Sequence, residues 1–164
     1  MANTSVYTGA DGSITLSVPS GAEGEAADAI INENELISVG RATGVRVEVH
    51  TDLKAFHELG QRFPTQLRPG NVSISGSIGR AFINGALLKL LLGEGANSRP
   101  AGAFIQPAFN ITLLLANPAT DGVQNTVTLH DVKLANWVYE IPEDQFVMEK
   151  VGFMAASLTV QDEG

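Results

Sequence analysis

The chain has 164 residues, 44% of them hydrophobic, which predicts one folded domain rather than a disordered chain. Its formal net charge of −8 argues against a surface that grips nucleic acid, because such surfaces need clustered Lys and Arg. The lack of cysteine excludes disulfides, thiolate metal sites and a cysteine nucleophile. No apolar run is long enough to span a bilayer and no signal peptide is visible, so we expect no membrane segment.

The first fifty residues predict an arm followed by short strands. Residues 1–12 are polar and contain glycine, so we expect a flexible N-terminal arm. Alternation of apolar and polar residues predicts a strand at 14–18. The acidic stretch 21–35 contains Gly21 and Gly24 and is interpreted as a loop. Short strands are expected at 36–39 and 45–49.

Residues 51–70 are expected to form a long interacting loop. The stretch is polar, and a connection near 20 residues between two strands is usually functional or makes contacts. It carries isolated apolar residues that need a surface to pack on. The candidate interface residues here are Leu53, Phe56, Leu59 and Phe63.

The middle of the chain predicts a strand, a helix and a further strand. Residues 71–78 alternate, and one face carries small, polar and uncharged side chains at Ser73, Ser75 and Ser77. That face suits water or a lumen. From Arg80 to Leu92 the apolar period becomes helical, so we expect a helix at 80–92. A strand is predicted at 109–115.

Residues 123–160 predict a long antiparallel C-terminal hairpin that turns at Pro142. Its alternation slips at His130–Asp131, which predicts a bulge or bend. Beyond Pro142 the hairpin is apolar on both faces, and a strand of that kind must be covered on both. Neighbouring copies would supply that cover, which makes Phe146 and Met148 further interface candidates.

Together these elements predict an α+β, mainly β, fold in a single domain spanning 1–164. We expect an antiparallel β-sandwich or barrel of about six strands with one packed α-helix.

Chemical motifs are largely missing from the sequence. His50 with Asp52, or His57 with Glu58, offers metal ligands or an acid–base pair, but no nucleophile or orienting group is spaced to help. Glu143–Asp144 is better explained as a solvated turn. We therefore predict no enzyme, no catalytic, metal or cofactor-binding residues, and no cofactor.

Three blocks in this order resemble tail tube proteins of contractile-tailed phages and related contractile injection particles. They are ISVGRATGVRVEV at 37–49 with a downstream HELG, GNVSISGSIGRAFINGALLKLLLG at 70–93, and the hairpin containing W-x-Y-x-I-P-E-D. The resemblance implies hexameric rings stacked into a tube whose wall is a continuous β-barrel around a channel. It implies sheath, baseplate and tail terminator proteins as partners. It also implies a place in the virion tail, after synthesis in the bacterial host cytoplasm.

The predicted function is therefore a structural tail tube subunit through which the genome passes into the host. DNA would pass without specific binding, along channel-lining candidates Glu48, Ser73, Ser75 and Ser77. The surplus acidity fits DNA slightly better than protein. The loop at 51–70 would then clasp an adjacent subunit.

Three alternatives stay open at this point. The serine face could instead pack against the helix at 80–92. The chain could be the tube subunit of a phage-like contractile injection particle that delivers protein effectors. It could also be a monomeric β-sandwich that binds a ligand through Trp137 and Tyr139.

Overall fold

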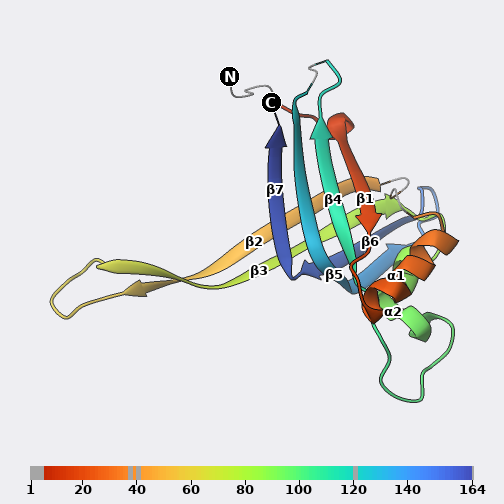
Figure 1. Ribbon diagram of the computed structural model, residues 1–164, viewed down its shortest axis with the longest axis horizontal. Helices are drawn as coiled ribbons and strands as arrows, with labels where there is room; N and C mark the ends of the chain where they lie inside the picture. Colours follow the sequence, from red (N-terminus) through yellow and green to blue (C-terminus); the bar gives the residue numbers. More distant parts are fainter. Residues whose placement is uncertain (1–5, 37–38, 40–41, 120–121, 164) are drawn as a thin grey trace.

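The computed structural model describes residues 6–36, 39, 42–119 and 122–163. Within them, seven β-strands form two sheets, and two α-helices lie at one end of the molecule (Figure 1). The strands are β1 (Gly12–Ser17), β2 (Ala42–Phe56), β3 (Gln66–Ala81), β4 (Phe109–Ala116), β5 (Gln124–Glu140), β6 (Met148–Ala155) and β7 (Ser157–Glu163). The helices are α1 (Ala22–Glu33) and α2 (Ala86–Leu92), with short 3-10 turns at Gly9–Asp11 and Gly93–Ala96. The mainly β, antiparallel fold class is confirmed, with one more strand and one more helix than expected.

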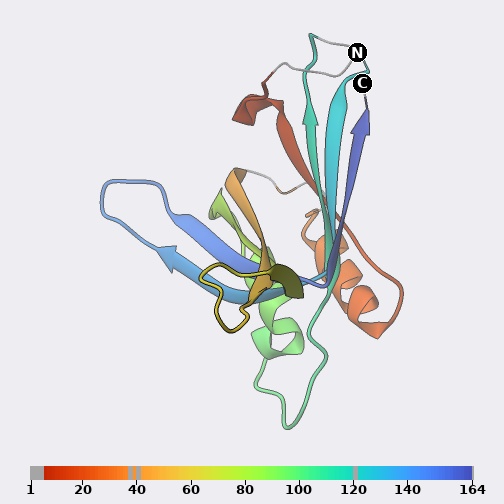
Figure 2. The same ribbon diagram turned by 90° about the vertical axis from the view of Figure 1, so that its left-hand side faces the viewer.

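The two sheets share strand β5 and diverge from it (Figure 2). Sheet A has the order β1-β4-β5-β7, and sheet B has the order β2-β3-β6-β5. The first part of β5 pairs with β4 and β7, whereas its second part, from Lys133 to Glu140, pairs with β6. The predicted C-terminal hairpin is confirmed, since β6 and β7 together run back along β5.

The bulge predicted at His130–Asp131 lies where β5 passes from one sheet to the other. Val132 lies opposite Phe109 and Leu129 lies opposite Ile111, so β5 carries one extra residue between these pairs. Asp131 has a φ of 52°, in the left-handed region, and its N–H donates to Asn110 Oδ1 at 3.1 Å. Ala156, at the break between β6 and β7, donates its N–H to the His130 carbonyl at 3.0 Å. The bend is therefore held by hydrogen bonds on both sides of β5.

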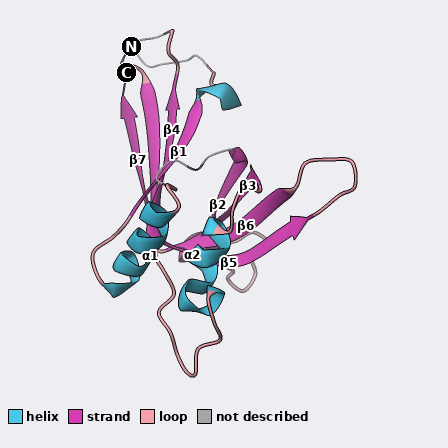
Figure 3. Cartoon of the chain, turned by 90° about the vertical axis from the view of Figure 1, so that its right-hand side faces the viewer, coloured by secondary structure: helices cyan, strands magenta, loops and turns pink. Residues whose placement is uncertain are grey.

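The core lies between the apolar faces of the two sheets and is closed by the helices (Figure 3). Strand period two places Ile74 and Ile78 of β3 beside Val151 and Phe153 of β6 on one buried face. Sheet A contributes an alternating set of buried residues of its own. Helical spacing brings buried residues from α1 and α2 into the same cluster. The sheet A and helix members are Leu16, Phe109, Ile111, Leu129, Val132, Ala27, Ile31, Ala86, Leu87 and Leu90.

The expectation of a loop over 21–35 is wrong, because residues 22–33 form α1. Ala27 and Ile31, one turn apart, are buried and give this acidic helix an apolar contact face. Gly24 sits in the first turn, where an added Cβ would come within 1.9 Å of the Pro19 carbonyl oxygen. A glycine that resembles a helix breaker in the sequence is therefore required for close packing.

Two further expectations need correction. Residues 51–70 are not one long loop: β2 continues to Phe56 and β3 begins at Gln66, so only 57–65 connect them. The helix expected from Arg80 begins at Ala86, because Arg80 and Ala81 still belong to β3.

Two other expectations fall partly outside the described residues: positions 1–5 of the expected N-terminal arm, and positions 37–38 of the expected strand at 36–39. The rest of the N-terminal arm includes a 3-10 turn, and Gly12 already belongs to β1.

Candidate assembly and channel surfaces

The face of sheet B that points away from the helices is lined by small polar side chains. Ser75 lies opposite Glu48 on β2 and Met154 on β6, and Ser77 lies opposite Arg46 and Gly152. The intervening residues of β3, Ile74 and Ile78, are buried on the other face with α2. The described helices thus do not cover the serines. We call this surface the serine face; its residues are Arg46, Glu48, His50, Ser73, Ser75, Ser77, Asn136, Val138, Glu140, Met148, Lys150, Gly152 and Met154.

The serine face is hollowed at its centre and its charges balance. A shallow depression of about 450 Å³ is lined by residues that include Arg46, Glu48, Ser75, Ser77 and Lys150. Arg46 Nη2 lies 3.8 Å from Glu48 Oε2, and both side chains are exposed. Lys133 lies opposite Met154 at the end of this face and is ion-paired with Glu23 on α1. The other cations of the face, Arg46 and Lys150, are matched in number by the anions Glu48 and Glu140. All four channel candidates, Glu48, Ser73, Ser75 and Ser77, share this face. Their place in a channel stays a prediction.

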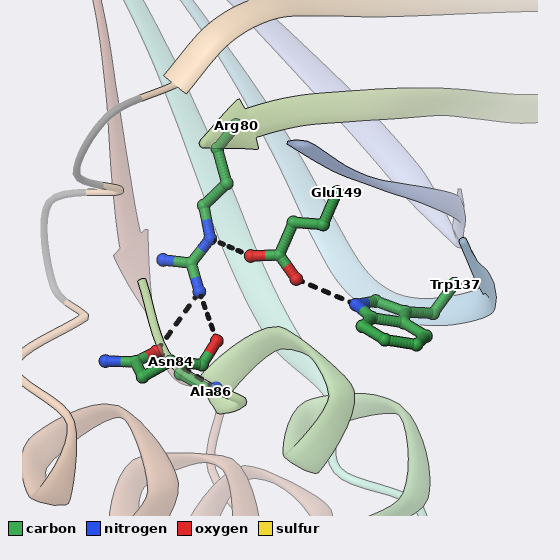
Figure 4. Close-up of polar contacts among 5 residues, drawn as sticks. All are labelled: Arg80, Asn84, Ala86, Trp137 and Glu149. Atoms are coloured by element: carbon green, nitrogen blue, oxygen red, sulfur yellow. Dashed lines mark hydrogen bonds and ion pairs between the residues drawn. The ribbon is translucent and has the colours of Figure 1, made fainter. Parts of the chain in front are cut away.

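A buried polar network fixes the opposite face of sheet B (Figure 4). Arg80 Nε donates to Glu149 Oε1, and the side chains of this ion pair are only 2% and 0% exposed. The other carboxylate oxygen, Oε2, accepts a 2.7 Å hydrogen bond from Trp137 Nε1. Arg80 Nη2 donates to the backbone O and to Oδ1 of Asn84, each at 3.2 Å. The same Oδ1 accepts from the N–H of Ala86 at 3.1 Å, so the network also holds the start of α2.

This network was not predicted, and it bears on the ligand-binding alternative. The ring centroids of Trp137 and Tyr139 are 4.4 Å apart, and those of Tyr139 and Phe82 are 5.4 Å apart. The aromatic groups pack on each other while the indole N–H is bound to Glu149. These contacts favour structural packing over a sugar or ligand site. A signal was present in the sequence, because Arg80 continues the parity of Ile74 and Ile78.

The distal part of the β2–β3 hairpin, residues 49–72, projects from the body of the molecule, and we call it the arm (Figure 1). Its register shifts between Thr51 and Leu53, where β3 carries an extra residue. The core-facing side of sheet B continues along the arm without a cover in the described structure. The exposed apolar residues of that side are Val49, Leu53, Leu67 and Val72.

The candidate interface residues lie at the two extremities of sheet B. Leu53 and Phe56 are on the arm, and Leu59 and Phe63 are in its terminal loop; all four are more than half exposed. At the opposite extremity, the 141–147 turn joining β5 to β6 carries Phe146, which is 88% exposed. Met148 begins β6 and is less exposed. The structure separates the candidates into two groups, and their contact with another copy stays a prediction.

Sheet B presents a free edge on each side. Its outermost strands are β2 and the second part of β5, and in the described residues neither has a partner on its outer side. The two edges face opposite directions across the same four-stranded sheet. An exposed edge of this length is a template for pairing with another chain.

The remaining polar candidates do not converge on a chemical site. Across the part of the chain that is described, no group of three or more His, Asp or Glu side chains is placed to hold a metal ion. His57 and Glu58 are exposed in the loop of the arm, and Glu143 and Asp144 are exposed in the β5–β6 turn. Among the described helices, none is long and apolar enough to cross a membrane.

Comparison with solved structures reveals fold similarity along nearly the whole chain. A chain of the sheath–tube complex of an extracellular contractile injection system, PVC in its extended state, superposes with a TM-score of 0.66 at 11% identity, covering 97% of this chain and 93% of that one. A chain of the anti-feeding prophage tube-terminating cap gives 0.65 at 14% identity, covering 99% and 95%. The SPP1 tail tube gives 0.59 at 10% identity, covering 96% and 80%. No protein-family model and no curated protein matches the sequence.

Proposed function

We propose that this chain, whose fold is that of tail tube proteins, is the structural subunit of a tail-type tube. The observation that carries the proposal is the pair of free edges on opposite sides of sheet B. If β2 of one copy pairs with the second part of β5 of the next, the four-stranded sheet continues from subunit to subunit. A ring of copies then closes it into a barrel, which removes both edges.

The orientation of the sheet supports a channel. The helices and sheet A lie on the core side of sheet B, so closure would place them outside and the serine face inside. The wall would then present Ser73, Ser75 and Ser77 to the lumen. Such hydroxyl groups stay hydrated and leave the channel without an apolar surface on which cargo would adhere.

Exposed apolar groups at both extremities supply the remaining contacts. The arm extends beyond the body of sheet B, and its apolar side is continuous with the core side. A neighbouring copy is the occupant expected for that side, because an exposed apolar sheet face on an isolated chain invites association. Phe146 and the β5–β6 turn offer apolar surface at the other extremity.

Partner proteins follow from the same role. Similar chains occur in structures described as a sheath–tube complex, a sheath/tube terminator and a baseplate. For this chain we infer the same classes of partner: copies of itself first, then sheath, terminator and baseplate proteins. The role is structural and requires no catalysis. The site of action would be the tail of a phage or of an injection particle.

Negative-stain electron microscopy of the purified protein tests the assembly. We expect rings and stacked tubes, with light scattering showing species far larger than the 17.3 kDa chain. The variant Leu53→Asp places a charge on the exposed apolar side of the arm. It should reduce assembly while the monomer stays folded. Monomers only, at high concentration and across salt conditions, would overturn the proposal.

A conduit for phage DNA and a tube that delivers protein are the two candidate roles for such an assembly. The genome conduit follows from the tail-tube resemblance and the acidic composition. The protein conduit is favoured by a specific observation, the balanced charge of the serine face. The two roles make different demands on the channel wall.

A further inference from the structure

The acidity of the chain does not lie on the serine face. The chain has a net charge of −8, but the cations Arg46 and Lys150 on this face are matched in number by the anions Glu48 and Glu140. A further cation, Lys133 opposite Met154, is ion-paired with Glu23 on α1. The carboxylates instead concentrate on other elements. Those on α1 and at the end of β7 are Glu23, Glu25, Asp28, Glu33, Asp162 and Glu163.

The cations on this face are placed to meet a passing molecule. Arg46 and Lys150 both line the central depression, on either side of the serines. Arg46 is exposed, and its contact with Glu48 is a loose 3.8 Å pair. Exposed pairs of this kind hold their partners weakly, so the guanidinium remains available to another anion.

The arm extends the pattern with further positive charge. Lys54 follows Glu48 and His50 at even positions of β2 and lies directly opposite Arg68 on β3. Asp52 is the acidic residue between them on β2. Cations therefore occur both on the body of sheet B, at Arg46 and Lys150, and on the arm, at Lys54 and Arg68.

From this arrangement we propose that the cargo of the tube is polypeptide rather than duplex DNA, with Arg46 and Lys150 as the residues that decide it. The proposal rests on the proposed function, because it needs the serine face to line a channel. Duplex DNA carries one negative charge per about 1.7 Å of its axis, and each neutralised phosphate strengthens binding. A ring repeats both cations in every subunit together with Glu48 and Glu140, so phosphates would meet exposed cations and no surplus of acidic groups that repels them. A duplex would then be held rather than passed.

A polypeptide meets the same wall differently. Protein surfaces carry both signs of charge at lower density, so attraction to Arg46 and Lys150 is offset by repulsion from them and by Glu48 and Glu140. Between the charges lie the hydroxyls of Ser73, Ser75 and Ser77, which bind water as readily as cargo. Charges farther apart than about 8 Å are largely screened at physiological salt. Such a wall neither holds nor excludes a protein of mixed charge.

The test measures what assembled tubes retain. Wild-type tubes are sedimented after incubation with a labelled short DNA duplex or, separately, with labelled ubiquitin, at low and high salt. We expect the duplex to be retained at low salt and released at high salt, and ubiquitin to be retained at neither. The variant Arg46→Gln with Lys150→Gln should lower retention of the duplex about tenfold at low salt.

A matched control locates the binding on the wall. Lys89→Gln with Arg99→Gln removes the same positive charge from α2 and the loop after it, away from the serine face, and should leave retention unchanged. Failure of wild-type tubes to retain the duplex at low salt would overturn the proposal, as would retention of ubiquitin. So would loss of DNA retention in the control variant rather than in the wall variant. Failure to form tubes would overturn the proposed function itself, and this inference with it.

Discussion

Arg80 on β3 and Glu149 on β6 lie directly opposite each other in the sheet and form a buried ion pair. The pair is completed by Trp137 and Asn84, which bind the remaining carboxylate oxygen and the guanidinium. In the described residues no buried side-chain nitrogen or oxygen is left without a partner. A network of this kind is sensitive to the loss of any one member, because the others stay buried.

Replacing Glu149 with alanine should therefore destabilise the folded chain strongly. The variant leaves the Arg80 charge buried without compensation, which costs about 3–5 kcal/mol of unfolding free energy. Urea unfolding followed by circular dichroism measures the change. The matched variant Glu23→Ala breaks the exposed pair with Lys133 and should cost no more than about 1 kcal/mol. Equal losses in the two variants would contradict the role of the buried pair.

Gly76→Ala should destabilise sheet B from within. A Cβ at this position would lie 2.1 Å from the Arg46 carbonyl oxygen and 2.6 Å from Phe153 Cζ, so the strands and the ring must move apart. We expect a loss of about 1–3 kcal/mol in unfolding free energy. Gly44→Ala is the control, since nothing lies within 4 Å of its added Cβ. A thermal melt in which Gly76→Ala matches the control would show that the close approach is not limiting.

Phe56→Ala should separate assembly from folding. Phe56 is 57% exposed on the arm, so its truncation should change monomer unfolding by no more than about 0.5 kcal/mol. Ring or tube formation, measured by sedimentation, should be weakened. Phe109→Ala removes a ring of the same size that is 1% exposed in the core, and should cost about 3–5 kcal/mol. If Phe56→Ala unfolds the monomer and assembly is otherwise intact, the arm is part of the core.

Phe146→Ser probes the opposite extremity of sheet B. The ring is exposed in the β5–β6 turn, so we expect unchanged monomer stability and a higher concentration threshold for assembly. Val160→Ser on β7 is the comparison, because it also removes an exposed apolar side chain but lies on sheet A. Light scattering across a dilution series distinguishes them. A similar threshold shift in both variants would mean that general hydrophobicity, rather than the turn, drives association.

The sequence predicted the elements whose residue period is regular. The strands around Val45, Ile74 and Ile111 alternate cleanly, and the slip at His130–Asp131 marked the bulge correctly because it interrupts a long alternating run. The face of the serines also followed from parity alone. The fold suggested by the resemblance is the fold that the structure has.

Other elements could not be predicted from the sequence, for physical reasons. In α1 the first turn is held by close packing of Gly24 against Pro19, a tertiary contact that local propensity cannot anticipate. On the arm, the register shift after Thr51 and the proline at position 69 break the alternation, so β2 and β3 resembled a loop. Phe82 falls on the helical stripe of α2 by spacing, yet its N–H donates to the Val147 carbonyl at the end of sheet B.

The sharing of β5 between the sheets has a mechanical meaning. In the proposed tube, a load along the wall would reach sheet A through the covalent backbone of β5, and not only through side-chain packing between the sheets. The force would change direction at the bend at His130–Asp131. The hydrogen bonds from Asp131 to Asn110 and from Ala156 to His130 would hold the bend in place. Under an axial push, the two sheets of one subunit would move as a single stiff bracket instead of sliding past each other.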